Sequence, residues 1–245
     1  MPSLTAYKAS LDYSYAPGLF PTIECLKHRE KQVRRVLVSE KTRDTEAETT
    51  LLALCGERNI RVEYADRVLR QISGKENCHA AAVFAKYEDT LAQDRPHIVL
   101  HHPSDCGNAG TILRTALGFG YTEVALIRPC VDLFDPRVVR SSMGSLFSLH
   151  VHVYDSFEAY REAAPGHLLY PFMLDASVPL ASVTALEKTS PFALVFGNEG
   201  TGLPAEFAQL GQAVRIESNS RVDSLNLSIA AGIGMYHFAG LTGIR

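Results

Sequence analysis

The chain has 245 residues, a formal net charge of −3 at pH 7 and 46 % hydrophobic residues, which is enough to build buried cores. No apolar run reaches the roughly 18 residues that a membrane span needs, and the first residues lack the basic start and apolar core of a secretory signal. The slightly acidic balance also removes the simplest argument for nucleic-acid binding, a basic isoelectric point. We expect a soluble cytoplasmic protein with no membrane contact.

Neither the cysteines nor the histidines form a recognisable metal-binding or disulfide pattern. The five cysteines are scattered, odd in number and without CxxC spacing, which favours reduced thiols. The closely spaced histidines are His101 with His102 and His150 with His152, and neither pair has the i, i+4 spacing of a helical metal site. We therefore expect no bound metal.

The first 94 residues predict a small α/β unit. Residues 1–18 look irregular, and apolar periodicity and helix-terminal residues mark the elements that follow. The expected helices are 21–29, 44–59 and 66–72, and the expected strands are 33–38, 60–64 and 79–85. The polar segment 92–96, closed by a proline, is the expected linker, so we place the domain boundary between residues 94 and 95.

Residues 95–245 predict a second α/β domain with a mostly parallel sheet. Regular alternation of strands and helices implies parallel strands covered by helices on both faces. The expected strands are 97–101, 123–127, 150–154, 168–174, 194–196 and 214–216, and the expected helices are 109–118, 136–147 and 156–163, a short one from Pro204 and a long apolar one from Leu225.

A basic cluster occupies the first domain, in the sequence KHREKQVRR. It contains Lys27, Arg29, Lys31, Arg34 and Arg35, opposed only by an intervening glutamate. A solvated helix end explains such a charge run as well as a contact with RNA does, and the sequence leaves both interpretations open.

A glycine-rich loop follows the strand that ends at Phe196. Gly197-Asn198-Glu199-Gly200-Thr201-Gly202 has three glycines in six residues, which let backbone N–H groups approach a ligand. The loop lacks the spacing of a dinucleotide or P-loop motif, so a purely geometric strand-to-helix turn is the alternative. At the end of a strand in an open α/β sheet, a ligand site is the stronger hypothesis.

Two further polar loops precede helices. In the loop 220–226, Asp223 or Ser224 is an expected N-cap, which places Asn226 in the first helical turn. In the loop after residue 101, Asn108 is an expected N-cap of the helix that carries Arg114. The apolar neighbours of this arginine indicate that at least one of its flanks is buried.

These segments resemble motifs of the SpoU (TrmH-like) branch of the SPOUT RNA methyltransferases. NAGTILRTA at 108–116, FGNEGTGL at 196–203 and DSLNLSIAA at 223–231 look like the three family motifs, in order. RSSMGSLF at 140–147 also matches, except that Met143 and Ser145 stand where small residues are common. The match covers roughly 97–245, and residues 19–90 are more weakly similar to a ribosomal-protein-like substrate-binding domain.

The resemblance implies a C-terminal α/β trefoil-knot domain that transfers a methyl group from S-adenosylmethionine to a ribose 2′-hydroxyl in tRNA or rRNA. It also implies a homodimer formed through the first and last helices of that domain, so that Arg114 acts next to the partner's cofactor. The residues that it assigns to the cofactor pocket are Leu174, Gly197, Ile216, Ser224 and Leu225.

The catalytic residues that the resemblance implies are Asn108, Arg114, Glu199, Ser224 and Asn226. A ribose hydroxyl is a poor nucleophile until its proton is removed, so the site needs a base and a held phosphate. An arginine side chain stays protonated under physiological conditions, so Arg114 is a difficult general base. Holding the phosphate and stabilising the negative charge of the alkoxide is the role that we favour for it. Glu199 is then expected to orient Arg114.

Two other classes of protein compete with this interpretation. A catalytically inactive RNA-binding protein would keep the fold but show damaged motifs, and these motifs are intact. An oxidoreductase with a nucleotide cofactor would carry GxGxxG after its first strand, and that motif is absent from this position.

Overall fold

The computed structural model describes residues 4–73, 77–176, 178–186, 191–219 and 221–244. The chain forms two compact units, an N-terminal unit of Met1–Tyr87 with Asp132–Ser148 and a C-terminal unit of Glu88–Val131 with Leu149–Arg245. This division by packing differs from the predicted boundary at 94/95, because one internal segment packs with the N-terminal unit. The assignment of separate functions to 1–94 and 95–245 stays a prediction.

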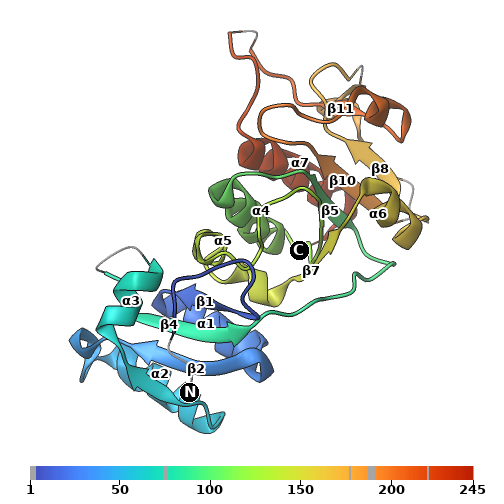
Figure 1. Ribbon diagram of the computed structural model, residues 1–245. Coiled ribbons are helices and arrows are strands. Elements are labelled where there is room, and N and C mark those ends of the chain that lie inside the picture. Colours follow the sequence, from blue (N-terminus) through green and yellow to red (C-terminus); the bar gives the residue numbers. More distant parts are fainter. Residues whose placement is uncertain (1–3, 74–76, 177, 187–190, 220, 245) are drawn as a thin grey trace. The chain divides into compact units, whose positions relative to one another are not determined.

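The N-terminal unit is built on a four-stranded sheet with the order β1-β4-β2-β3 (Figure 1). β4 runs antiparallel to both of its neighbours, whereas β2 and β3 are parallel. Its strands are β1 (Tyr13–Pro17), β2 (Val33–Val38), β3 (Val62–Tyr64) and β4 (Ala80–Ala85), and its α-helices are α1 (Leu19–His28), α2 (Glu46–Glu57), α3 (Asp66–Ser73) and α5 (Pro136–Ser141).

β1 was not predicted, because residues 1–18 were expected to be irregular. It pairs with β4 in a register that places Tyr15 opposite Val83, and Tyr15 is fully buried. Because β4 lies far along the chain, this pairing cannot be detected from local periodicity. The segment 132–148 also joins this unit: a Cβ on Gly144 would lie 2.9 Å from Cβ of Glu24 in α1, so the two backbones pack closely.

The C-terminal unit is built on a five-stranded sheet with the order β7-β6-β5-β10-β8, in which every neighbouring pair is parallel. The predicted α/β class and parallel sheet are therefore confirmed. The strands are β5 (His97–His101), β6 (Glu123–Ile127), β7 (His150–Tyr154), β8 (Leu168–Pro171) and β10 (Phe192–Phe196), with the short pair β9 (Val178–Pro179) and β11 (Val214–Arg215) beside them, and the α-helices are α4 (Cys106–Gly118), α6 (Phe157–Ala163) and α7 (Leu227–Thr242).

Both faces of this sheet are buried, as its uninterrupted apolar strands predict. Val99, Ala125 and Val195 pack with α6 residues in one core, so the alternate strand positions face the other side. There α4 and α7 lie side by side (Figure 1), and the Tyr121 hydroxyl after α4 donates to the carbonyl of Met235 in α7, 3.1 Å away.

Several elements are shorter than predicted, and some are of another type. β8 ends at Pro171 rather than at residue 174, because the chain then leaves β10: the N–H of Met173 donates to the carbonyl of Val214 instead. The helix expected from Pro204 is the 3₁₀ helix η5 (Ala205–Gln209), and the one expected over 136–147 is α5 followed by the 3₁₀ helix η3 (Ser145–Ser148).

Among the described helices, none has both the length and the apolar character needed to cross a bilayer.

Gly234 in α7 is a sensitive packing position, since a Cβ there would lie 2.5 Å from Cζ of Phe172 and 3.2 Å from Cζ of Phe196. These two rings are stacked with centroids 4.5 Å apart. We predict that Gly234→Ala lowers the free energy of unfolding by about 1–3 kcal/mol, measured by urea denaturation, because the stacked rings have to move.

The matched control for this substitution is Gly240→Ala in the same helix, where a Cβ would meet no atom within 4 Å. Alanine favours a helix over glycine, so this variant is expected to gain up to about 1 kcal/mol. Equal effects of the two substitutions would contradict the packing argument.

The buried side chain of His97 should make the free energy of unfolding depend on pH. Its side chain is fully buried at the start of β5, hydrogen-bonded to the Tyr160 hydroxyl (3.1 Å) and the Ala92 carbonyl (2.9 Å). Burial lowers the pKa of His97 from 6.5 to about 4. A group whose folded pKa lies below its unfolded value stabilises the fold fully above the unfolded pKa, and this contribution is lost as the pH falls toward the folded pKa.

We therefore expect the free energy of unfolding to fall as the pH is lowered from 6.5 to 4.5. His97→Gln should reduce that slope by up to about 1.4 kcal/mol per pH unit, measured by urea denaturation across the range. The control is His79→Gln, which replaces an exposed histidine of the other unit and should change the slope less than His97→Gln does. A His97→Gln slope as steep as the wild type would show that this histidine does not set the pH dependence.

Candidate active site

The loops after β5 and β10 meet at the carboxyl edge of the C-terminal sheet. β5 and β10 are parallel neighbours, and the chain order reverses between them: β6 and β7 continue on one side and β8 lies on the other. Such a switch point is where open α/β sheets bind ligands. The amide nitrogen of Asn198 in the second loop donates to the carbonyl of His102 in the first, 2.8 Å away, so the two loops are tied together.

Glu199 is the main link between the two loops. Its carboxylate accepts hydrogen bonds from the N–H (3.0 Å) and hydroxyl (2.7 Å) of Ser104 and from the N–H of Asp105 (3.1 Å). Burial by itself raises the pKa of Glu199, but these hydrogen bonds outweigh it and hold the pKa below its usual range. The side chain is therefore a carboxylate at neutral pH.

Asn108 continues this network toward a third loop. Its amide nitrogen lies 3.4 Å from Oε1 of Glu199, and its Oδ1 accepts a hydrogen bond of 3.0 Å from the amide nitrogen of Asn226. The segments that begin α4, follow β10 and begin α7 are thus joined through three polar side chains. All three were predicted as catalytic residues, and they lie together.

Both predicted helix caps near these residues are wrong. α4 begins three residues earlier than predicted, because Oδ1 of Asp105 accepts the N–H of Asn108 at 2.7 Å and so Asp105 is the N-cap. α7 is capped by Asn226 itself, whose Oδ1 accepts the N–H groups of Ser228 and Ile229, and not by Asp223 or Ser224. Of the loop 220–226, residue 220 lies outside the described residues.

A pocket adjoins this network, and we call it the donor pocket. It is lined by all five residues that the family resemblance assigned to the cofactor, which are Leu174, Gly197, Ile216, Ser224 and Leu225. At Gly197 a Cβ would lie 2.2 Å from the carbonyl carbon of Gly202, so only glycine fits the turn. Leu174 lines the pocket and is 70 % exposed.

Arg114 lies on α4, exposed to solvent. In the part of the chain that the structure describes, its guanidinium forms no hydrogen bond or ion pair. The Glu199 carboxylate accepts hydrogen bonds from the Ser104–Asn108 segment and from the neighbouring Asn198 side chain instead. The role of Glu199 in orienting Arg114 stays a prediction. Within one chain, Glu199 holds the loop that begins α4.

The sequence did not single out three residues that build the site. Ser104 and Asn198 connect the two loops, and the Phe172 ring forms a wall of the donor pocket. Asn198 lies within the glycine-rich loop that the sequence indicates, and Ser104 lies four residues before Asn108 in the loop after residue 101, but neither was named as a site residue. Phe172 follows β8 and comes close only because the chain there turns toward β11. Among the described residues, no group of three His, Cys, Asp or Glu side chains is arranged to hold a metal ion.

The geometry agrees with comparisons to known proteins. Residues 95–236 match the SpoU rRNA Methylase family, and residues 15–89 match the family described as RNA 2′-O ribose methyltransferase substrate binding. A solved structure described as an AdoMet-bound rRNA methyltransferase from Sinorhizobium meliloti is similar, with a TM-score of 0.75 and 25 % identity over 92 % of this chain and 86 % of that one.

Two curated relatives share the C-terminal sequence. An uncharacterized tRNA/rRNA methyltransferase of Synechocystis sp. is 37 % identical over 142 residues, which are 57 % of this chain and 51 % of the relative. The 23S rRNA (guanosine(2553)-2′-O)-methyltransferase RlmP of Bacillus subtilis is 32 % identical over 163 residues, 65 % of this chain and 64 % of the relative. The match thus spans about half to two thirds of these relatives. Because the family match covers more than half of its residues, this chain belongs to the SpoU rRNA methylase family.

Proposed function

We propose that this protein transfers a methyl group from S-adenosylmethionine to a ribose 2′-hydroxyl of tRNA or rRNA. The observation that carries the proposal is the hydrogen-bonded set Asn108, Glu199 and Asn226 beside the donor pocket. The names of the relatives support it, because the Bacillus subtilis protein is a 2′-O-methyltransferase of 23S rRNA and the Sinorhizobium meliloti structure is AdoMet-bound. A trefoil knot and a cytoplasmic location stay predictions from the sequence.

The chemistry of the donor-pocket lining suits S-adenosylmethionine. Gly197 lines the pocket without a side chain of its own, and Leu174 and Leu225 offer apolar surface to a flat ring. When bound, the sulfonium compound supplies an electrophilic methyl group. The residues of this chain orient that group and limit the access of water to it.

The acceptor side requires a group that favours the alkoxide form of the ribose hydroxyl. Arg114 keeps its charge at any physiological pH, so we assign it to holding phosphate and stabilising negative charge rather than to removing the proton. Glu199 is a carboxylate that accepts hydrogen bonds from the loop that begins α4. Its role is to fix the loop next to Asn108, which then presents its amide toward the reacting groups.

We also propose a homodimer formed through α4 and α7. The two helices lie side by side, and three large apolar side chains of α7 are exposed at helical spacing: Ile229 (55 %), Ile233 (38 %) and Tyr236 (70 %). An apolar stripe of this kind is typical of a surface that another molecule covers. A second copy on this stripe would place Arg114, on the neighbouring helix, near the partner's donor pocket.

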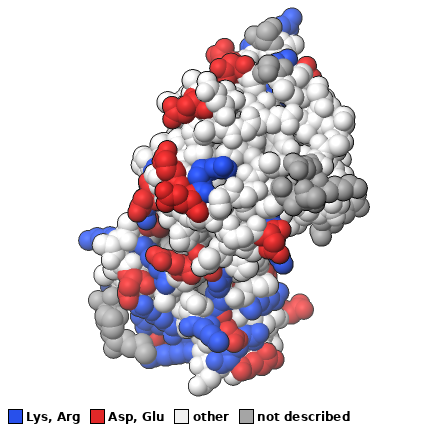
Figure 2. Space-filling view, turned by 90° about the vertical axis from the view of Figure 1, so that its right-hand side faces the viewer, with Lys and Arg blue, Asp and Glu red and all other residues white. Residues whose placement is uncertain are grey.

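The RNA is proposed to contact the N-terminal unit, whose sequence matches a substrate-binding family. Three of the five basic residues of the cluster are already paired within this unit: Lys27 with Glu24 at 3.3 Å, Arg34 with Asp12 at 2.7 Å and Arg35 with Glu63 at 3.0 Å. Figure 2 accordingly shows blue and red side chains interspersed over this unit rather than one continuous basic surface. The residues proposed to contact RNA in this unit are Lys27, Arg29, Lys31, Arg34 and Arg35 of the cluster together with Arg137 and Arg140. Arg221 of the C-terminal unit is proposed as a further RNA contact.

Arg114→Ala tests the catalytic assignment. We expect methyl transfer from labelled S-adenosylmethionine to bulk tRNA and rRNA to be lost, while the Kd for S-adenosylmethionine, measured by calorimetry, stays within about twofold, because the arginine does not line the donor pocket. Arg161→Ala on α6 is the control and should retain activity. A wild-type protein that binds the cofactor and methylates no RNA would support the inactive RNA-binding alternative. Turnover by Arg114→Ala would remove this arginine from the mechanism.

Ile229→Glu tests the dimer. Burying an unpaired carboxylate in an apolar interface destabilises the dimer, so we expect this variant to sediment as a monomer. We also expect it to lose methyl transfer, although the substitution changes no residue that lines the donor pocket. Leu52→Glu, which alters an exposed leucine of α2, is the control and should sediment as the wild type does. A wild-type protein that is monomeric at micromolar concentration and active would refute the proposed assembly.

A further inference from the structure

A second cavity opens at the carboxyl edge of the C-terminal sheet, and we call it the His102 pocket. It lies between the loops that follow β5, β6 and β10, and its lining includes His102, Pro103, Pro129 and Cys130. Its volume of about 480 Å³ falls within the roughly 300–1,000 Å³ that is usual for small-molecule sites. Asn198 and Thr201 line both this cavity and the donor pocket, so the two cavities adjoin.

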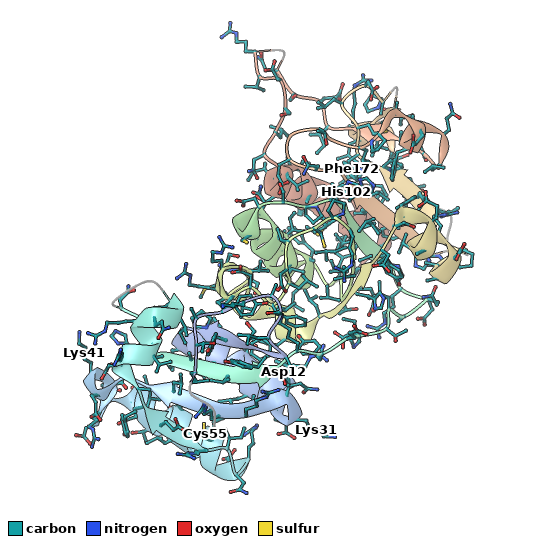
Figure 3. All side chains as sticks on the ribbon, in the orientation of Figure 1. Asp12, Lys31, Lys41, Cys55, His102 and Phe172 are labelled. Carbon is teal, nitrogen blue, oxygen red and sulfur yellow. The ribbon has the colours of Figure 1, made fainter. Side chains whose placement is uncertain are left out.

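The imidazole of His102 forms a fixed flat wall of this pocket. It stacks on the ring of His101 with centroids 3.7 Å apart and planes 28° apart, and Figure 3 shows it at the end of β5. Its backbone has a φ of 58°, a left-handed conformation uncommon outside glycine, and its carbonyl accepts the hydrogen bond from Asn198. The contact that joins the two loops therefore restrains the backbone of His102, and the stacking on His101 holds the ring.

The chemistry of the lining favours an uncharged planar ligand. Among the described residues that line the pocket there is no Lys, Arg, Asp or Glu, which disfavours a phosphate or a metal ion as the occupant. Two proline rings and an imidazole supply flat surface, and Ser104, Asn198 and Thr201 supply polar groups. A nucleobase combines a flat apolar face with polar edges, and stacking on aromatic side chains is how unpaired RNA bases are bound.

The position of the pocket indicates to which nucleotide of the RNA the bound base belongs. Ser104 lies in its wall and donates to Glu199, which in turn lies next to Asn108. A base in the pocket would therefore have its ribose beside the polar network and next to the donor pocket. Resting on the proposed methyl transfer, we propose that the His102 pocket binds the base of the nucleotide whose ribose is methylated, with His102 as its stacking platform.

The test uses the full-length protein saturated with S-adenosylhomocysteine and the four ribonucleoside 5′-monophosphates as probes. We expect at least one monophosphate to bind, measured by NMR chemical-shift changes, without displacing S-adenosylhomocysteine. His102→Asn should weaken that binding about tenfold or more, because the ring is lost while asparagine tolerates the left-handed backbone. His28→Asn, an exposed histidine of the other unit, is the matched control and should bind as the wild type does.

Cys130→Phe provides a second variant that fills the pocket and should also abolish monophosphate binding, whether or not His102→Asn folds. Three results would overturn the pocket: binding of no monophosphate by the wild type, competition with S-adenosylhomocysteine, or unchanged affinity in both pocket variants. Methyl transfer by the wild-type protein to bulk RNA is measured separately. Transfer that persists while the pocket fails refutes only this inference, whereas absence of transfer refutes the proposed function.

Discussion

The contact between the Glu199 carboxylate and the loop that begins α4 is the interaction on which the rest of the site depends. β5 and β10 bring their carboxyl ends to one edge of the sheet, but their loops would be free to separate without a link. Glu199 supplies that link through two donors of Ser104 and the N–H of Asp105. Hydrogen bonds to a carboxylate are stronger than those between neutral groups, so these three donors hold the two loops together firmly.

Several neighbouring features follow from this contact. With the loop fixed, Asp105 can cap α4, and the side chain of Asn108 is left to reach Asn226 at the start of α7. Asn198, next to Glu199, holds the backbone carbonyl of His102, whose ring stacks on His101. One short segment after β10 thus positions two helix N-termini and the walls of two cavities.

Close packing on the other side of the donor pocket imposes a steric constraint. Gly197 has no room for a Cβ beside Gly202, and Gly234 of α7 has none beside Phe172 and Phe196. These contacts exclude side chains from the backbone that a cofactor would approach. A methyl transfer needs donor and acceptor in line at close distance, and two adjoining rigid cavities meet this requirement better than mobile loops do.

The amino-acid sequence by itself determined how strands and helices alternate along the C-terminal domain. Uninterrupted apolar runs and glycine-rich turns are local signals, which is why they could be read from the sequence. Its motifs also identified Asn108, Glu199 and Asn226, which lie together, and the five residues that line the donor pocket. Only the tertiary structure decided the helix caps, the pairing of β1 with β4, and the contact of Glu199 with Ser104. A cap depends on which of several adjacent polar side chains points at the free N–H groups, and strand pairing joins residues far apart in the chain. Neither is encoded in local spacing, since both depend on contacts that exist only after the chain has folded.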